Sequence, residues 1–242
     1  MDIPKLYNSL LILPTFILWF IFIYIIGYFI IFKNWNNKYR SEASSCLMSL
    51  SHGTPVLVLS ISSTFFLETS KHSNIIQLDL ASPNAPFHNL VLEYSIAYFL
   101  ADLLHYTVLV PSDALIVVHH LATLYVLMTC RYLFDHGAVA ILGILVLAEA
   151  DSANAAGLFE LLSPWFYGYY SVVRGVFGPV YVYKMGLFFT DVCNGGVIIP
   201  RWGWISWIVV IVVGIGVSIL WVLHLWIDLF RQRFKKKIKK LS

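Results

Sequence analysis

The chain has 242 residues, of which 59% are hydrophobic and only 12% charged, and its formal net charge is +3. Soluble globular domains carry about 25% charged residues, so this composition excludes a water-soluble fold and predicts a polytopic membrane protein. One membrane domain uses nearly the whole length. Any chemistry is therefore expected within the bilayer or at its edge.

Seven stretches of the chain have the roughly 20 apolar residues that a membrane-spanning helix needs. They lie at about residues 9–32, 45–67, 90–110, 114–132, 137–161, 165–189 and 204–230. The sequence therefore predicts an all-α membrane bundle of about seven spans. Only residues 111–113, Pro-Ser-Asp, separate the third span from the fourth. This predicts a tight antiparallel hairpin in which these two helices are neighbours.

The basic residues are unevenly placed along the chain. Lys33, Lys38 and Arg40 follow the first span, and residues 231–240 form a dense basic run after the last one. With seven spans both groups lie on one side of the membrane, and positively charged flanks favour the cytosolic side. We therefore predict a cytosolic C-terminus, with a basic tail that fixes topology and does not bind nucleic acid.

The C-terminus carries a further signal. Lys239 and Lys240 are fourth and third from the end, a spacing that resembles the di-lysine retrieval signal of endoplasmic-reticulum membrane proteins. A Lys-rich tail also produces this spacing by chance, and both interpretations stay open. The spacing predicts an endoplasmic-reticulum location if the tail is cytosolic.

Polar side chains form a stripe on the third span. Tyr94, Tyr98, Asp102 and His105 are separated by four, four and three residues, so they share one face of a helix. A carboxylate and an imidazole one turn apart lie within reach of each other. Polar groups at bilayer depth are costly and are interpreted as functional by default.

The fourth span places two adjacent histidines in an apolar segment. His119 and His120 are followed by Thr123, four and three residues later, so its hydroxyl is expected to border both rings. Because the hairpin makes the third and fourth spans neighbours, Asp102, His105 and the His pair could converge. Imidazoles there suit proton abstraction or acyl transfer. The alternative is a set of hydrogen-bonded core residues without catalysis.

Later spans add further polar groups. Asp151 could orient an imidazole as well as Asp102 could, since carboxylates do so in catalytic triads. Arg174 lies in the middle of the sixth span, where an interhelical ion pair would neutralise it. A mononuclear metal site built from Asp102, His105 and the His pair fits by residue type. The histidine clusters of membrane di-iron enzymes are missing from the sequence, and we expect no metal.

Four segments carry a resemblance to a known family. They are residues 35–45, 98–102, 119–123 and 145–154. On these segments the chain resembles the TLC-domain family, the membrane fold shared with ceramide synthases, and in particular the small plant TLC-domain-containing proteins. The resemblance implies a TLC-type six-helix barrel with one leading span. It divides the chain into a leading span at 1–34, a TLC domain at 35–234 and a basic cytosolic tail at 235–242.

The resemblance also implies roles for individual residues. His119, His120 and Thr123 match the His-His-x-x-Thr element of ceramide synthases, and Asp151 matches the first Asp of a later His-Asp-x-x-Asp element. Ala150 stands where that element has His, and residue 154 is Asn where it has the second Asp. These two departures argue against ceramide synthase catalysis.

Two functions follow from the resemblance. The first is a lipid-binding protein that influences membrane lipid composition, its partner a sphingolipid or fatty-acyl lipid. The alternative is a sphingoid-base N-acyltransferase with acyl-CoA as co-substrate and no resident cofactor. The predicted catalytic residues are His119, His120 and Asp151, and the predicted substrate-binding residues are Asp102, His105, Thr123, Asn154 and Arg174. A transporter is disfavoured because the spans show no paired, interrupted helices.

Overall fold

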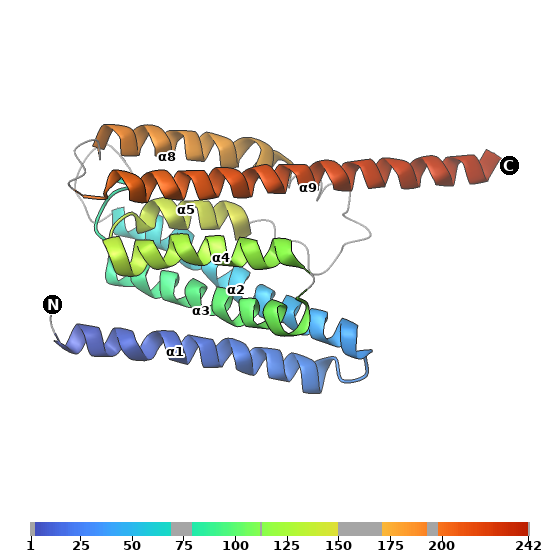
Figure 1. Ribbon diagram of the computed structural model, residues 1–242, viewed down its shortest axis with the longest axis horizontal. Helices are drawn as coiled ribbons and strands as arrows, with labels where there is room; N and C mark the ends of the chain where they lie inside the picture. Colours follow the sequence, from blue (N-terminus) through green and yellow to red (C-terminus); the bar gives the residue numbers. More distant parts are fainter. Residues whose placement is uncertain (1–2, 69–78, 112, 150–170, 193–197, 242) are drawn as a thin grey trace.

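The computed structural model describes residues 3–68, 79–111, 113–149, 171–192 and 198–241. This part of the chain is all-helical, with seven α-helices and three π-helical segments. Their bounds are α1 Ile3–Ile26, η1 Gly27–Ile31, α2 Asn37–Glu68, α3 Pro86–Leu109, α4 Ala114–Met128, η2 Thr129–Phe134, α5 Ala138–Glu149, η3 Val173–Phe177, α8 Gly178–Val192 and α9 Arg201–Leu241. The helices lie side by side in one bundle, and the two chain ends lie at opposite ends of it (Figure 1).

Four of the described helical segments are long and apolar enough to cross a membrane. They are Ile12–Ile31, Tyr39–Ser63, Ala114–Phe134 and Arg201–His224, and Ala138–Ala148 is a shorter apolar helix. Helix α3 has 24 residues, which is long enough, but its polar stripe lowers its hydropathy. The chain is therefore a multi-pass membrane protein with a helical bundle.

The second helix begins earlier than the apolar pattern predicts. Helix α2 starts at Asn37, and its first helical hydrogen bond runs from the Arg40 amide to the carbonyl of Asn36, 2.8 Å away. Lys38 and Arg40, which precede the predicted second span at 45–67, therefore lie in the first turn of α2. Apolarity marks the part of a helix within lipid, whereas backbone hydrogen bonding continues into polar residues.

The hairpin between the third and fourth spans is confirmed. Pro86 opens α3 at a position where its missing N–H costs nothing. At the other end, the amide of Asp113 donates to the carbonyl of Val110 at 3.1 Å. The Asp113 carboxylate then accepts from the amide of Ile116 at 3.4 Å and caps α4. Helices α3 and α4 pack against each other along the hairpin.

The opposite end of the bundle is closed by a turn between η2 and α5. Asp135 and Gly137 both have positive φ, at 53° and 85°, and a glycine suits the second position because a Cβ there would lie 2.9 Å from the ring of Trp207. Hydrogen bonds from the side chain of Asn84 hold the two ends of this turn together. Its side-chain amide donates to the carbonyl of Cys130 at 3.0 Å, and its oxygen accepts from the amide of Ala138 at 2.9 Å.

The last helices pack on the outside of α4 and α5. Gly143 on α5 lets Tyr181 of α8 approach so closely that a Cβ would overlap the phenol, whose hydroxyl donates to the carbonyl of Ala140 at 3.1 Å. Trp207 of α9 is fully buried and donates to the hydroxyl of Thr129 at 2.8 Å. Aromatic side chains of α8 and α9 therefore determine where these two helices pack against the core.

Helix α9 extends well beyond the bundle (Figure 1). Its 41 residues span about 60 Å, roughly twice the hydrocarbon thickness of a bilayer. The predicted seventh span, 204–230, and the predicted tail, 235–242, therefore fall on one helix as far as Leu241. Helix-forming Lys, Arg, Leu and Ile dominate the end of this helix, and neither Gly nor Pro interrupts it after Gly216.

Candidate functional site

The polar stripe of α3 leads to a buried carboxylate in the middle of the bundle. Asp102 is 2% exposed. One of its oxygens accepts from the hydroxyl of Ser45 on α2 at 2.6 Å, and the other accepts from the hydroxyl of Tyr98, one turn earlier on α3, at 3.3 Å. The second oxygen also lies 2.9 Å from Nε2 of His120 on α4. Three helices thus meet at one carboxylate.

The hydrogen bonds of His120 define its protonation. Its Nδ1 lies 2.8 Å from the carbonyl oxygen of Ile116, and because a carbonyl only accepts, Nδ1 carries a proton. One further proton then lies between Nε2 and the carboxylate of Asp102. Whether that proton is on the nitrogen or on the oxygen, the pair has no net charge. This explains how a carboxylate and an imidazole are both buried in an apolar bundle.

The two adjacent histidines face different surroundings. His120 is 5% exposed, whereas His119 is exposed, and its ring centroid lies 6.3 Å from that of Phe99 on α3. The two rings are nearly perpendicular, with centroids 5.7 Å apart. The hydroxyl of Thr123 donates to the carbonyl of His119 at 2.9 Å, so its hydrogen bond goes to the backbone and to neither imidazole.

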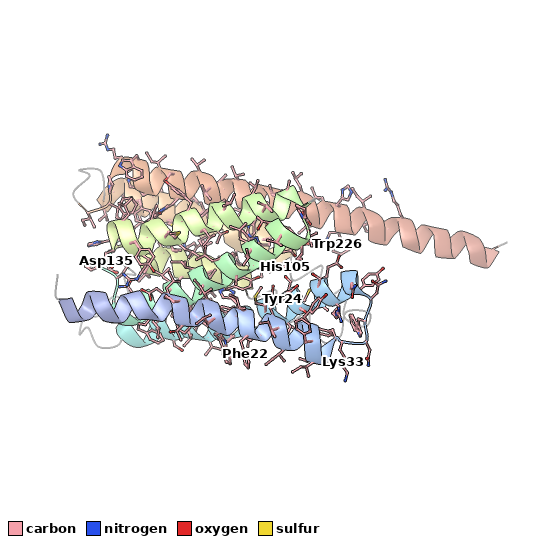
Figure 2. The ribbon with its side chains drawn as sticks, turned by 60° about the horizontal axis from the view of Figure 1, so that its bottom comes forward. Phe22, Tyr24, Lys33, His105, Asp135 and Trp226 are labelled. Atoms are coloured by element: carbon pink, nitrogen blue, oxygen red, sulfur yellow. The ribbon has the colours of Figure 1, made fainter. Side chains whose placement is uncertain are left out.

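His105 lies one turn beyond Asp102 on the same buried face of α3. It is 6% exposed, and neither of its ring nitrogens has a hydrogen-bond partner among the described residues. Its ring centroid lies 5.3 Å from that of Tyr24 on α1 and 5.0 Å from that of Tyr106, and Figure 2 shows Tyr24 and His105 side by side. A buried imidazole gives up its hydrogen bonds to water, and without protein partners nothing offsets that loss of free energy.

The four candidate ligands of a metal do not converge as the sequence allowed. Asp102 and His120 meet, His105 lies nearby without a hydrogen bond among the described residues, and His119 is exposed. Within the described ranges, no group of three His, Cys, Asp or Glu side chains is arranged to hold a metal ion. The mononuclear site considered from residue types is therefore not formed there.

Helix α2 supplies polar partners that the sequence analysis missed. The hydroxyl of Ser49 lies 2.7 Å from that of Tyr98, and the fully buried ring of His52 stacks on Tyr98 with centroids 4.1 Å apart. Ser45, Ser49 and His52 are separated by four and three residues. That spacing matches the stripe on α3, and it is the signal that would have identified them.

A second ion pair, between a buried carboxylate and a half-buried guanidinium, also escaped the sequence analysis. Glu93 on α3 is 2% exposed. It accepts from two nitrogens of Arg131 on η2, at 2.9 and 2.6 Å. The predicted fourth span, 114–132, ends just after Arg131, and residues 38 apart along the chain give no pairing signal until α3 and α4 are aligned.

Of the remaining predicted residues, Arg174 lies close enough to His119 for an electrostatic interaction, and two lie outside the described residues. Arg174 on η3 donates to the carbonyl of Ala148 at the end of α5, at 3.0 Å. Asp151 and Asn154 fall outside the described residues. The roles assigned to all eight predicted site residues therefore stay predictions.

Comparison with known proteins identifies the family. The chain is 45% identical over 247 residues to a TLC domain-containing protein of Arabidopsis thaliana, with 94% of this chain and 93% of that protein covered. The chain belongs to the TLC-domain family. No family model matches this TLC-domain protein, and no solved structure does. Because the match spans nearly the full length, the relationship is not confined to the short histidine motif.

Proposed function

We propose that this TLC-domain protein binds a membrane lipid and thereby influences the lipid composition of its membrane. The Asp102–His120 pair carries this proposal. It is buried in the bundle, held by Ser45 and Tyr98, and neutral as a pair. Polar networks at bilayer depth are rare and usually mark functional sites. This network offers hydrogen-bond donors and acceptors to a polar lipid headgroup, and the apolar helices around the network suit the lipid's chains.

The arrangement of the helices supports a TLC-type barrel of six helices after a leading one. Helix α1 precedes six described helices, α2 to α5, α8 and α9. Lys33 lies at the end of the bundle from which α9 extends with its basic residues (Figure 2). A shared cytosolic side for these cations follows from the positive-inside rule, and Lys239 and Lys240 would then act as a retrieval signal of the endoplasmic reticulum.

Replacing Asp102 by Asn tests the proposal. The amide has nearly the same shape, can donate to Nε2 of a neutral His120 and can still accept from Ser45, so the variant is expected to fold. The full-length chain is expressed in yeast, and membrane lipids are quantified by mass spectrometry against empty vector. We expect the wild type and the control His119→Ala to shift the composition, and Asp102→Asn to lose most of that shift at equal membrane abundance. If abundant wild-type protein leaves the lipid composition equal to that of the empty-vector cells, the proposal is refuted.

A second function, sphingoid-base N-acylation with acyl-CoA, has one specific observation in its favour. The carboxylate of Asp102 orients the imidazole of His120, as carboxylates do in catalytic triads, and the adjacent imidazole of His119 is exposed. Both nitrogens of His120 are already engaged, by Ile116 and Asp102, whereas the exposed ring of His119 has no hydrogen bond within the described part of the chain. His119 would therefore be the base, and His120 a positioning residue.

Purified protein in nanodiscs, labelled sphinganine and a panel of acyl-CoAs test this second function. Acylation should fall at least about a hundredfold in His119→Ala, because general-base groups contribute about 10²–10⁴-fold. The folded His119→Ala variant thus separates the two functions, since lipid binding predicts no loss. Absence of product with every acyl-CoA from folded wild-type protein would reject the enzyme.

A further inference from the structure

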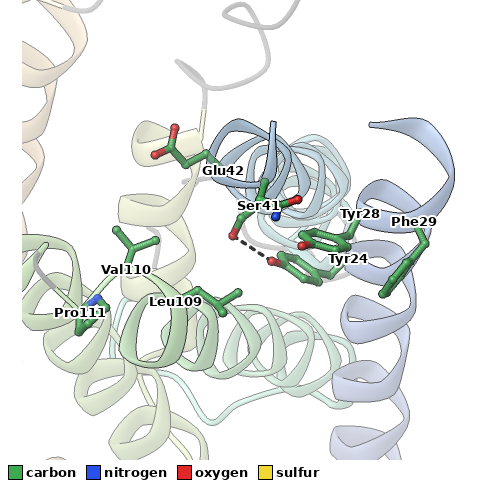
Figure 3. A pocket seen from close by; sticks show the side chains of 9 residues that line it. Tyr24, Tyr28, Phe29, Ser41, Glu42, Leu109, Val110 and Pro111 are labelled. Atoms are coloured by element: carbon green, nitrogen blue, oxygen red, sulfur yellow. Dashed lines mark hydrogen bonds between the residues drawn. The ribbon is translucent and has the colours of Figure 1, made fainter. Parts of the chain in front are cut away.

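A pocket lies at the end of the bundle where α1, α2 and α3 meet (Figure 3). Its volume is about 650 Å³, within the range of about 300–1,000 Å³ found for small-molecule sites. The segment Ile12–Ile31 ends here and Tyr39–Ser63 begins here, so the pocket lies at the level of the membrane interface. Phe29 and Leu109 line it and are 64% and 53% exposed. A ligand in the pocket can therefore extend apolar chains along α1 and α3 into the bilayer.

The polar groups of the pocket suit a ligand that carries hydroxyl groups. They are the hydroxyls of Tyr24, Tyr28 and Ser41, the amide of Asn37 and the carboxylate of Glu42. Glu42 is exposed and forms no ion pair within the described part of the chain. None of the described lining residues is basic, and Arg40, which packs over the ring of Tyr28, does not line the pocket. A phosphate there would face a carboxylate, whereas ligand hydroxyls can donate to the carboxylate and accept from the other groups.

Tyr24 separates the pocket from the buried network of Asp102 and His120. Its hydroxyl lies 3.2 Å from that of Ser41 (Figure 3). Its ring packs against the ring of His105 with centroids 5.3 Å apart, and Figure 2 shows these two side chains side by side. His105 is 6% exposed and follows Asp102 by one turn of α3. The side chain of Tyr24 is therefore a barrier between the pocket and the buried polar groups.

The buried side of this barrier favours the same ligand chemistry as the pocket. Neither ring nitrogen of His105 has a hydrogen-bond partner among the described residues. A neutral imidazole offers one donor and one acceptor, and a hydroxyl group can pair with either of them. An ammonium group only donates, so it would leave the N–H of the ring without an acceptor. A hydroxyl group is thus suited to both sides of Tyr24.

We propose that this pocket is the entrance for a membrane lipid with an uncharged, hydroxyl-bearing headgroup. The headgroup binds beside Glu42 and the hydroxyls of Tyr24 and Ser41. Rotation of Tyr24 then lets a ligand hydroxyl reach His105, next to the buried network. This entrance deepens the lipid-binding function proposed above, on which it rests, because it names the class of headgroup and its route from the membrane.

Native mass spectrometry of the full-length protein in detergent tests the class of headgroup. The lipids compared are a monoglucosyl diacylglycerol, a phosphatidylglycerol and a phosphatidylcholine with the same acyl chains. Phosphatidylglycerol also carries a diol but adds a phosphate. We expect the glucosyl lipid to bind wild type at least about fivefold more tightly than either phospholipid, because only the phosphates meet the carboxylate of Glu42. Phospholipids that bind as tightly as the glucosyl lipid would overturn the proposal.

Substitution of Glu42 tests where the headgroup binds. Glu42→Gln should weaken the glucosyl lipid about tenfold or more, the equivalent of one charge-assisted hydrogen bond, and should not weaken phosphatidylglycerol. The matched control Asp191→Asn removes an exposed carboxylate of α8 that does not line the pocket, and binding should stay within about twofold. Because Glu42 is exposed, the variant is expected to fold. Wild-type affinity of folded Glu42→Gln for the glucosyl lipid would place the headgroup elsewhere and refute this site.

The reaction of His105 with diethyl pyrocarbonate, followed by peptide mass spectrometry, tests the barrier. His105 should react at least about tenfold faster in Tyr24→Ala than in wild type, because the ring that covers it is removed. Ser41→Ala keeps that ring and removes only the partner of its hydroxyl, so it should give a smaller increase even if Tyr24→Ala does not fold. The control Phe22→Ala removes an exposed ring of α1 and should leave the rate within about twofold. If neither Tyr24→Ala nor Ser41→Ala reacts faster than Phe22→Ala, Tyr24 is not the barrier.

Two comparisons identify the source of the ligand and separate this site from the lipid-composition function. Methyl glucoside, which has the headgroup without chains, should compete at least about a hundredfold less well than the glucosyl lipid, since it buries no acyl chain. Equal competition would assign the pocket to a soluble sugar and reject the lipid. Binding that depends on Glu42, in a protein that leaves the lipid composition of yeast unchanged, would refute only the function. A shifted composition with binding independent of Glu42 would refute only the entrance.

Discussion

The coupling between Asp102 and His120 can be measured with a double-mutant cycle of alanine substitutions. Each single substitution leaves a buried polar partner, either a carboxylate that is 2% exposed or an imidazole that is 5% exposed. Breaking a buried pair from one side costs about 3–5 kcal/mol. Removing both groups leaves only the hydroxyls of Ser45 and Tyr98, and the latter keeps its contact with Ser49 at 2.7 Å. The double variant should therefore cost about 2–3 kcal/mol less than the sum of the singles.

Equilibrium unfolding of the full-length protein in mixed micelles gives the four free energies. Unfolding by sodium dodecyl sulfate is followed by tryptophan fluorescence and by circular dichroism, and the two signals must agree. The matched control is His119→Ala, which removes the adjacent but exposed imidazole and should change stability by less than about 0.5 kcal/mol. If the Asp102 and His120 effects add within about 0.5 kcal/mol, the two groups are not coupled and the reasoning about the pair is wrong.

Three further substitutions test the packing of the bundle by the same unfolding assay. Gly143→Ala should lower the free energy of unfolding by about 1–3 kcal/mol, because the added Cβ would overlap the phenol of Tyr181 on α8. The control Gly214→Ala on α9 meets open space and should not change the free energy of unfolding. Equal effects of the two substitutions would refute the close approach of Tyr181 to Gly143. Glu93→Gln should cost about 1.5–3 kcal/mol, because it removes the charge of a buried carboxylate that accepts two hydrogen bonds from Arg131, and an unfolding free energy equal to that of wild type would contradict this. Asn84→Ala should lower the free energy of unfolding by about 2–3 kcal/mol, because the carbonyl of Cys130 and the amide of Ala138 lose their hydrogen-bond partner. Amide hydrogen exchange should then become faster only in the turn after η2. Unchanged exchange there would contradict the role of Asn84 in holding this turn.

Several features of the fold could be predicted from residue patterns. The low charge content implied a membrane bundle, and the Pro-Ser-Asp connection implied that α3 and α4 are neighbours. The spacing of Tyr98, Asp102 and His105 placed them on one helical face, because 3.6 residues complete a turn. These inferences hold because each depends on a short stretch of chain.

Other features depended on how helices are rotated against one another. Periodicity shows that His119 and His120 point about 100° apart, but it does not show which of them turns towards α3. Packing of α3 and α4 buried the ring of His120 and left that of His119 exposed. The pairing of Arg131 with Glu93 likewise depends on how these two helices are aligned and rotated against each other.

The sequence by itself determined that this is a helical membrane protein with buried polar groups, because composition and helical spacing are local properties. Only the tertiary structure decided that Asp102 pairs with His120, that serines of α2 complete the network, and that Arg131 pairs with Glu93. Such contacts join residues far apart in the chain, and their distances are set by the packing of side chains between helices, which no single helix specifies.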